Sequence, residues 1–298
     1  MKRILVALDG SSESEQILGE VSRIGSRQTA VDLLHVLPRP HHEIPNVGAE
    51  VEDVAADCLR RAAGRIRERT VRTYLWRGEP EEEIPHAADV LKADLIAMTT
   101  HARRGLSSLL MGSVAQAVMR HSSLPILMTR PELEAPNRPL VRILVPVDGT
   151  EQSTGICSAV QDLAMESGAE VIFFQVLVPV LVVDPVTGFM PLGVPEPLPD
   201  PSAGLEELAL RFRKQGILAR TLVAHGTAAD QILEQARKID ADLIAMSTSA
   251  RRGLSRLVLG SVAEDVVRRM DRAVLLHRET SRSETPVHAQ EVHAHGAD

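Results

Sequence analysis

Two glycine-serine pairs, Gly112-Ser113 and Gly260-Ser261, each precede a segment with the apolar spacing of a helix. A helix begins with backbone N–H groups that have no partner inside the helix, and such groups can bind an anion such as a phosphate. An arginine pair lies a few residues before each glycine, and guanidinium groups fit phosphate oxygens well. The candidate phosphate-binding residues are Arg103, Gly112, Ser113 and Val114 in the first half of the chain and Arg251, Gly260, Ser261 and Val262 in the second. The alternative is that each Gly-Ser pair only caps its helix and that the arginines are solvated.

An aspartate follows the first apolar run of each half, at Asp9 in RILVALDG and at Asp148 in RILVPVDG. In open parallel sheets, ligands bind outside the carboxyl ends of the strands, where the strand order reverses. A carboxylate repels phosphate, so we expect these aspartates to meet the hydroxyls of a ribose. The alternative role is a cap on the following helix.

Residues that could carry catalysis do not recur in the two halves. His35 and His101 are replaced in the second half by glutamine and serine, and no nucleophile with a base and an orienting group is found at matching positions. Cys58 and Cys157 occupy non-equivalent positions, so we expect inert, reduced thiols on helices and no metal cluster. Turnover of any ligand is therefore expected to be slow or absent.

The positioning elements come from an internal duplication. Residues 93–115, ADLIAMTTHARRGLSSLLMGSVA, recur at 241–263 as ADLIAMSTSARRGLSRLVLGSVA, with 18 of 23 positions identical. We predict one domain over residues 1–132 and a second over 140–279, joined by the proline-rich linker Pro131–Pro139. Residues 280–298 show no apolar periodicity and are expected to be a disordered tail.

Each half alternates short β-branched runs with longer helical stretches, which predicts an α/β fold with a doubly wound parallel sheet. The strands expected in the first half are Arg3–Leu8, Val31–Leu37, Val71–Trp76, Leu95–Thr99 and Ile126–Thr129, and the helices are Ser12–Ser26, Ala49–Arg69, Glu81–Leu91 and Ser113–His121. Pro85 is expected to be tolerated only in the first turn of its helix. The strands expected in the second half are Arg142–Val147, Val171–Val176, Leu218–Val223, Leu243–Met246 and Val274–His277.

Composition limits the partners. The net charge is −7 with no block of like charges, so we expect no nucleic-acid partner. No apolar run is suited to cross a membrane, and the chain passes from Met1 directly into a strand without a signal peptide, so a cytoplasmic location is expected. Aromatic residues make up only 2%, which predicts an aliphatic core and a ligand held by backbone groups and aliphatic side chains.

The aspartate after the first strand, the ADLI run, RRGLS and GSVA together resemble the universal stress protein family, as a tandem pair covering nearly the whole chain. The resemblance implies two copies of a Rossmann-like, nucleotide-binding type of domain, each a five-stranded parallel sheet in the order 3-2-1-4-5. Members that bind ATP carry Gly-x-x-Gly, nine residues, then Gly-Ser or Gly-Thr. Here the two glycine positions hold Thr99 and Ala102 in the first half and Ser247 and Ala250 in the second, while the nine-residue gap is kept.

Carried over by position, the resemblance implies that adenosine is held by Ala7, Leu8, Asp9 and Val36 in the first half and by Pro146, Val147, Asp148 and Val176 in the second. The expected function is a stress-response protein that binds ATP or a related adenine nucleotide, with or without Mg²⁺, as a regulatory ligand. A nucleotide-free interaction module and an adenylating enzyme of the same broad fold are the alternatives.

Two further expectations concern assembly. The last strands, Pro125–Met128 and Ala273–His277, are expected to pack together within one chain, and association into a homo-oligomer is also expected. The proline-rich segment Pro179–Pro201 occurs only in the second half, as a lid over the ligand or as a contact surface.

Overall fold

The computed structural model describes residues 1–39, 47–100, 111–178, 201–249 and 259–279 of the 298-residue chain. The tail 280–298, the arginine pairs at 103–104 and 251–252, Ala102 and Ala250 lie outside these residues. The same holds for 179–200 of the proline-rich segment, whereas Pro201 already begins a helix.

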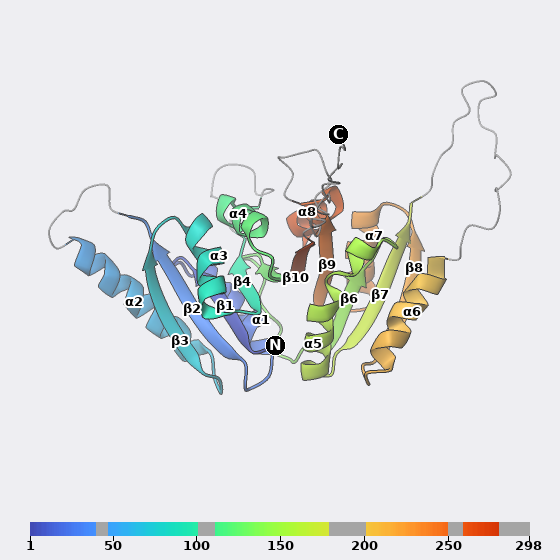
Figure 1. The fold of residues 1–298 in the computed structure, drawn as a ribbon, viewed down its shortest axis with the longest axis horizontal. Helices are drawn as coiled ribbons and strands as arrows, with labels where there is room; N and C mark the ends of the chain where they lie inside the picture. The colour runs from blue at the N-terminus through green and yellow to red at the C-terminus, as the bar shows by residue number, and fades with distance from the viewer. Residues whose placement is uncertain (40–46, 101–110, 179–200, 250–258, 280–298) are drawn as a thin grey trace, which may run out of the picture.

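Ten strands form one sheet (Figure 1). They are β1 (Arg3–Leu8), β2 (Ala30–Leu37), β3 (Val71–Arg77), β4 (Leu95–Thr99), β5 (Ile126–Thr129), β6 (Arg142–Pro146), β7 (Glu170–Leu177), β8 (Ala219–His225), β9 (Leu243–Ser249) and β10 (Ala273–Glu279). The helices are α1 (Ile17–Arg23), α2 (Val47–Arg65), α3 (Pro80–Leu91), α4 (Ser113–His121), α5 (Cys157–Ser167), α6 (Pro201–Arg213), α7 (Ala228–Lys238) and α8 (Ser261–Arg269), and the short 3-10 turns η1 (Ser14–Gln16) and η2 (Glu151–Thr154) precede α1 and α5.

The strand order is β3-β2-β1-β4-β5-β10-β9-β6-β7-β8. Each half therefore has the order 3-2-1-4-5 with parallel neighbours, which confirms the predicted fold class. In the centre, β5 pairs with β10 in the antiparallel direction, with Leu127 opposite Leu275. This pairing confirms that the two last strands join the halves within one chain.

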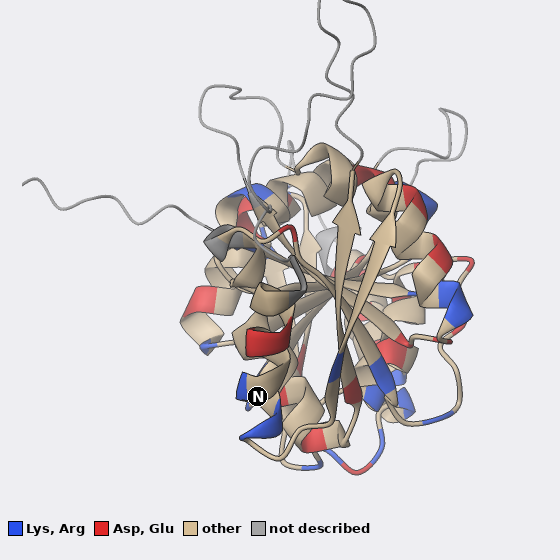
Figure 2. Cartoon of the chain, turned by 90° about the vertical axis from the view of Figure 1, so that its right-hand side faces the viewer, with Lys and Arg blue, Asp and Glu red and all other residues tan. Residues whose placement is uncertain are grey.

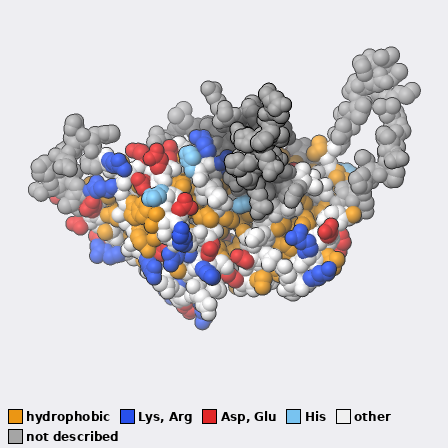
Figure 3. All heavy atoms as spheres, in the orientation of Figure 1, with side chains coloured by type: hydrophobic (Ala, Val, Ile, Leu, Met, Phe, Trp, Pro, Cys, Tyr) orange, Lys and Arg blue, Asp and Glu red, His pale blue; other side chains and the backbone are white. Residues whose placement is uncertain are grey.

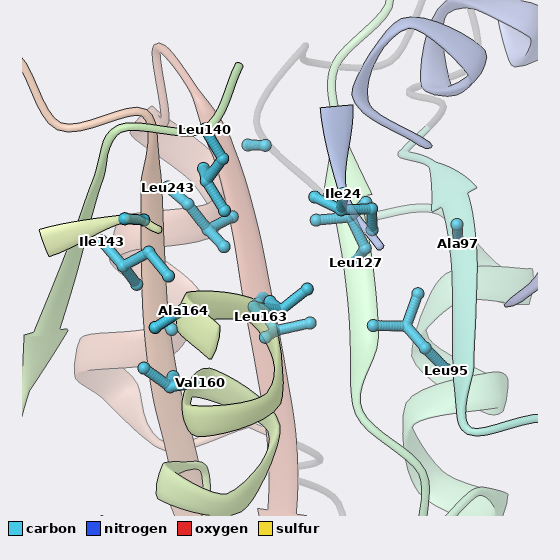
Figure 4. Packing of buried hydrophobic residues seen from close by; sticks show 14 of the residues in the cluster. Ile24, Leu95, Ala97, Leu127, Leu140, Ile143, Val160, Leu163, Ala164 and Leu243 are labelled. Carbon is cyan, nitrogen blue, oxygen red and sulfur yellow. The ribbon is translucent and has the colours of Figure 1, made fainter. Parts of the chain in front are cut away.

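Apolar side chains cover both faces of the sheet and run through both halves. One buried cluster packs the sheet against α1, α2, α5 and α6, and the other packs it against α3, α4, α7 and α8. The first cluster crosses the junction, where Leu163 of α5 points toward Leu127 of β5 (Figure 4). Because aromatic residues are scarce, the packing is almost entirely aliphatic.

Charged residues lie mainly on helices, loops and strand ends, while the strands themselves are largely uncharged (Figure 2). On the face shown in Figure 3, side chains of both signs are interspersed over the two halves. Cys58 and Cys157 lie on α2 and α5 as predicted, and neither forms a disulfide. Burial raises the pKa of the Cys157 thiol to about 11, which disfavours the reactive thiolate.

Some predicted boundaries were wrong. The first helix was expected over Ser12–Ser26, but α1 begins only at Ile17, because residues 9–14 form a hydrogen-bonded turn that is followed by the 3-10 turn η1. At its other end α1 stops at Arg23. Pro85 lies in the second turn of α3 and not in its first, since the helix begins with Pro80. Proline has no N–H to donate, so the second turn of this helix has one hydrogen bond fewer.

The repeated aspartate of the ADLI run has a structural role at the amino ends of the strands. Oδ2 of Asp94 accepts the N–H groups of Lys2 (2.6 Å) and Arg3 (2.9 Å). Asp242 holds the start of β6 in the same way. This part of the repeat therefore fixes β1 to β4, and β6 to β9, at the end of the sheet away from the glycine-serine pairs.

Candidate functional site

A cavity of about 980 Å³ opens at the carboxyl ends of β1 and β4, where the strand order of the first half reverses. Its apolar wall is aliphatic and comes from β1, β2, α3 and β4. The polar side consists of the turn after β1 and the first turn of α4. The predicted residues that line it are Ala7, Leu8, Asp9, Val36, Thr99, Gly112, Ser113 and Val114.

The turn after β1 is held by its own side chains. Ser11 donates to Oδ1 of Asp9 from its backbone N–H (3.0 Å) and from its hydroxyl (2.5 Å). The Ser14 hydroxyl accepts the N–H of Asp9 (3.3 Å) and donates to the carbonyl of Ser11 (2.8 Å). Gly10 has a φ of +83°, a conformation that side-chain-bearing residues rarely adopt. The carboxylate of Asp9 thus orders this turn.

The second half repeats this turn. Thr150 donates to Oδ1 of Asp148 from its N–H (3.0 Å) and its hydroxyl (2.6 Å), and Gly149 has a φ of +84°. Burial acts to raise the pKa of Asp148, but the hydrogen bonds from Thr150 and Ser153 outweigh it and hold the pKa below its ordinary value. Asp148 is therefore ionised at neutral pH and can accept hydrogen bonds from ligand hydroxyls.

Gly112 and Gly260 are the N-cap residues of α4 and α8, and among the described residues no side chain caps either helix start. The φ values are −58° and −63°, so the backbone conformation does not itself require glycine. Ser113 and Ser261 are the first helical residues and are exposed. The cavity wall includes residues 112–115, so the start of α4 faces the cavity.

Thr99 and Ser247 stand at the first glycine position of the family pattern, and both hydroxyls have partners within the protein. Oγ1 of Thr99, which is buried, donates to the carbonyl of Ser14 (3.1 Å). Oγ of Ser247 accepts the N–H of Ile156 (2.9 Å). In each half this side chain therefore ties the end of the fourth strand to the segment after the first strand.

The other predicted residues of the second half take corresponding places. Pro146 ends β6, Val147 follows it and is buried, Val176 is half-buried on β7, and Val262 lies in the first turn of α8. Because Pro146 has no N–H to donate, the pairing of β6 with β9 stops at Leu144, whereas β1 pairs with β4 as far as Val6.

Several residues at the cavity were missed from the sequence. Ser14 carried a usable signal, since Asp-Gly-Ser/Thr-x-x-Ser occurs after the first strand of both halves. Pro131 and Glu132, from the linker between the halves, also line the cavity. No local pattern marks a linker residue as part of a site.

None of the helices in the described ranges is both long and apolar enough to cross a membrane.

The comparisons with known proteins agree with this architecture. The model of the universal stress protein family matches residues 1–130 and 140–278. A universal stress protein of Methanocaldococcus jannaschii is 32% identical over 140 residues, which cover 45% of this chain and 80% of the relative. One from Mycolicibacterium smegmatis is 22% identical over 298 residues, covering 92% of this chain and 96% of the relative.

Among solved structures, a universal stress protein from Archaeoglobus fulgidus superimposes with a TM-score of 0.69 at 19% identity, over 93% of this chain and 98% of that one. This likeness concerns the fold of the tandem pair. Because the family model matches both halves, the chain belongs to the universal stress protein family.

Proposed function

We propose that this protein binds ATP or a related adenine nucleotide as a regulatory ligand in a cytoplasmic stress response. The observation that carries the proposal is the cavity of about 980 Å³ that extends from the turn at Asp9 to the first turn of α4. Small-molecule sites are concave, mostly apolar and of this order of size. They also carry a few polar groups that orient the ligand.

Each part of the cavity suits one part of a nucleotide. Ala7, Val36 and Met98 offer an aliphatic surface for the adenine ring. The Asp9 carboxylate is suited to the ribose hydroxyls. The N–H groups at Ser113 and the following residues, which no described side chain caps, suit a phosphate. The matching residues of the second half support a second site of the same type.

A regulatory role is favoured over hydrolysis because no nucleophile with a base and an orienting group recurs at matching positions in the two halves. The hydroxyls of Ser11, Ser14 and Thr99 all donate to acceptors within the protein. Across the part of the chain that the structure describes, no three His, Cys, Asp or Glu side chains gather as a metal-binding group. We therefore propose that any Mg²⁺ comes with the phosphates of the nucleotide.

The proposal is tested by releasing bound nucleotide from the purified full-length protein and by titrating it with ATP. The wild-type chain is expected to hold or bind adenine nucleotide. The double variant Ser113→Glu and Ser261→Glu is expected to lose about tenfold or more in affinity, because each carboxylate repels phosphate at a helix start. Ser123→Glu is the matched control, since Ser123 is exposed and follows the opposite end of α4.

Three results are informative. Equal affinity in the wild type and the double variant would mean that the helix starts are not the phosphate site. A wild-type chain that neither retains nor binds nucleotide would support an interaction module instead. Release of pyrophosphate from ATP with an acceptor substrate would support the adenylating enzyme.

A further inference from the structure

His35 packs directly behind the turn that follows β1. Its side chain is 9% exposed, and in the register of the sheet it is opposite Leu8, the last residue of β1. A Cβ atom placed on Gly10 would lie 3.2 Å from Cε1 and 3.7 Å from Nδ1 of the imidazole. The ring therefore fills the space beneath the glycine of the turn.

The imidazole reaches the turn from the side away from the cavity. Successive residues of a strand point to opposite faces of a sheet. Leu34 and Val36 of β2 line the cavity, so His35 between them points to the other face. The turn itself contributes Asp9 and Ser11 to the cavity wall. A ligand in the cavity would thus be influenced by His35 through the turn, which makes His35 a candidate positioning residue.

In the second half the same contact is made by an amide. Gln175 follows Phe174, which is opposite Pro146, and so takes the place of His35. Its Nε2 lies 3.4 Å from a Cβ atom placed on Gly149. The hydrogen bonds of the aspartate and the left-handed glycine are the same in both turns. The side chains beneath the two turns therefore differ in whether they can gain a proton near neutral pH.

The surroundings of His35 disfavour the protonated ring. Nδ1 is buried and has no hydrogen-bond partner. Burial lowers the pKa of His35 below its ordinary value, although the Asp9 carboxylate acts in the opposite direction. The titratable and charged groups on the neighbouring elements are Asp9 and Glu13 of the turn, Glu15 of η1, Arg77 of β3, and Glu52, Cys58 and Arg65 of α2. Of these, Asp9 is the one whose charge acts on the pKa of the imidazole.

We propose that His35 positions the ribose-binding turn of the first half and makes nucleotide binding there sensitive to protonation, whereas Gln175 leaves the second half insensitive. This inference rests on the proposed function and names a regulation of one of its two sites. A cationic ring beneath the turn costs free energy as long as it stays buried. Either the ring moves toward solvent or Asp9 turns toward it, and each change takes the turn out of the geometry that receives a ribose.

The direction of the effect follows from the environment of the ring. The pKa of the packed imidazole is lower than that of a solvated one, so the packed form is favoured above a pH of about 6.5. That advantage is lost as the pH falls below this value. We therefore expect nucleotide affinity in the first half to weaken in mildly acidic solution.

The experiment measures each half separately within the full chain. Ser261→Glu leaves the first half to bind, and Ser113→Glu leaves the second. Titration calorimetry with ATP at pH 7.5 and pH 5.5 gives the change in the dissociation constant of each half. The titration of the phosphates cancels in the comparison, because the ligand is the same. We expect the affinity of the first half to fall by about threefold more than that of the second.

Exchanging the two residues tests the cause. In the Ser261→Glu background, His35→Gln is expected to remove the additional pH dependence. In the Ser113→Glu background, Gln175→His is expected to introduce it. His86→Gln is the matched control, because His86 is exposed on α3 and does not line the cavity.

The imidazole can also be observed directly. In the NMR spectrum of the histidine side chains, the signal of His35 is the one that His35→Gln removes. Its pKa in the free protein is expected to lie below the ordinary value and to fall further when ATP is added. A ligand that binds better to the neutral form must disfavour protonation by the same factor, since the coupling is reciprocal.

The outcomes separate this inference from the proposed function. An equal change of affinity with pH in the two halves, a first-half affinity that rises as the pH falls, or a pKa of His35 that ATP does not move overturns the role of His35 while nucleotide binding stands. Failure of the wild-type chain to bind ATP at either pH overturns the proposed function and the inference together.

Discussion

The guanidinium of Arg23, in the first half, donates from Nη2 to Oδ1 of Asp242, in the second half, over 2.6 Å. The two side chains are 5% and 0% exposed. The same guanidinium donates to Glu20 (2.7 Å) and to the carbonyl of Arg138 in the linker (2.9 Å). One buried cation thus connects α1, the linker and the start of β9.

Removing this cation is expected to destabilise the whole chain. Arg23→Met leaves Glu20 and Asp242 buried with fewer partners, which lowers the free energy of unfolding by about 3 kcal/mol. Urea unfolding followed by circular dichroism measures the loss. The control is Arg27→Met, whose pair with Glu68 is 83% and 65% exposed, and for which about 0.5 kcal/mol or less is expected. Equal losses of unfolding free energy in Arg23→Met and Arg27→Met would show that the buried pair contributes no more to stability than the exposed one.

Replacing Asp32 on β2 is expected to stabilise the protein. Its side chain is 1% exposed, its nearest cation is Nε of Arg3 at 3.5 Å, and neither oxygen accepts a hydrogen bond from a described residue. The matching position in the second half is Ile172, which is fully buried. At pH 7.5, Asp32→Ile should raise the free energy of unfolding by about 1–3 kcal/mol, and Ile172→Asp should lower it.

The effect of Asp32 depends on pH. Burial raises the pKa of this carboxyl, although Arg3 and Arg72 act in the opposite direction. A carboxyl with a raised pKa in the folded state stabilises that state below its unfolded pKa of about 3.9, and this contribution is lost as the pH rises through the raised value. The advantage of Asp32→Ile over the wild type should therefore shrink as the pH falls. If the difference in unfolding free energy between Asp32→Ile and the wild type did not change with pH, the ionised Asp32 carboxylate would not be the cause of the destabilisation.

The Thr99 hydroxyl is expected to position the turn at the first-half cavity. Thr99→Val keeps the volume of the side chain but removes the donor to the Ser14 carbonyl, at a cost of about 1 kcal/mol in stability. If the proposed function holds, nucleotide affinity should fall in the first half and remain unchanged in the second. Thr99→Ser should restore both the stability and the first-half affinity. Titration calorimetry in the Ser261→Glu background, in which the second half is expected not to bind, measures the first-half affinity. If Thr99→Val lowered the nucleotide affinity of both halves equally, the effect would come from lost stability, and Thr99 would not have a positioning role at the first-half cavity.

A fragment of residues 1–132 is expected to dimerise. Without the second half, β5 would present a free edge and the apolar side chains of Ile126, Leu127 and Met128 that β10 and its neighbours cover in the full chain. Sedimentation velocity would detect the dimer, and Leu127→Lys should weaken it. A monodisperse monomer would show that the edge can be left open. Association of the full-length chain into a homo-oligomer stays a prediction that the same measurement addresses.

The sequence predicted most accurately what depends on local pattern and on the repeat. The bounds of β1, β4, β5 and α4 follow from short apolar runs and from the glycine before Ser113, and the strand order follows from the family resemblance. It could not predict contacts between residues far apart in the chain. From the sequence alone, Arg23 would be assigned to the surface, because its contact with Asp242 is not visible there. Glu132 would be assigned to the linker. No neighbouring residue in the sequence indicates that Asp32 is buried.

The central pairing of β5 with β10 also has a consequence for how the two halves can evolve. Two separate chains that joined along this edge would associate only above a certain protein concentration. If the two chains were identical copies, every substitution would occur in both of them. Here the linker makes the encounter intramolecular, so the assembly persists at any expression level. Each half always pairs with the other, non-identical half, so a substitution in one half leaves the sequence of the other unchanged. A fused pair is therefore free to divide its ligands between two unlike sites.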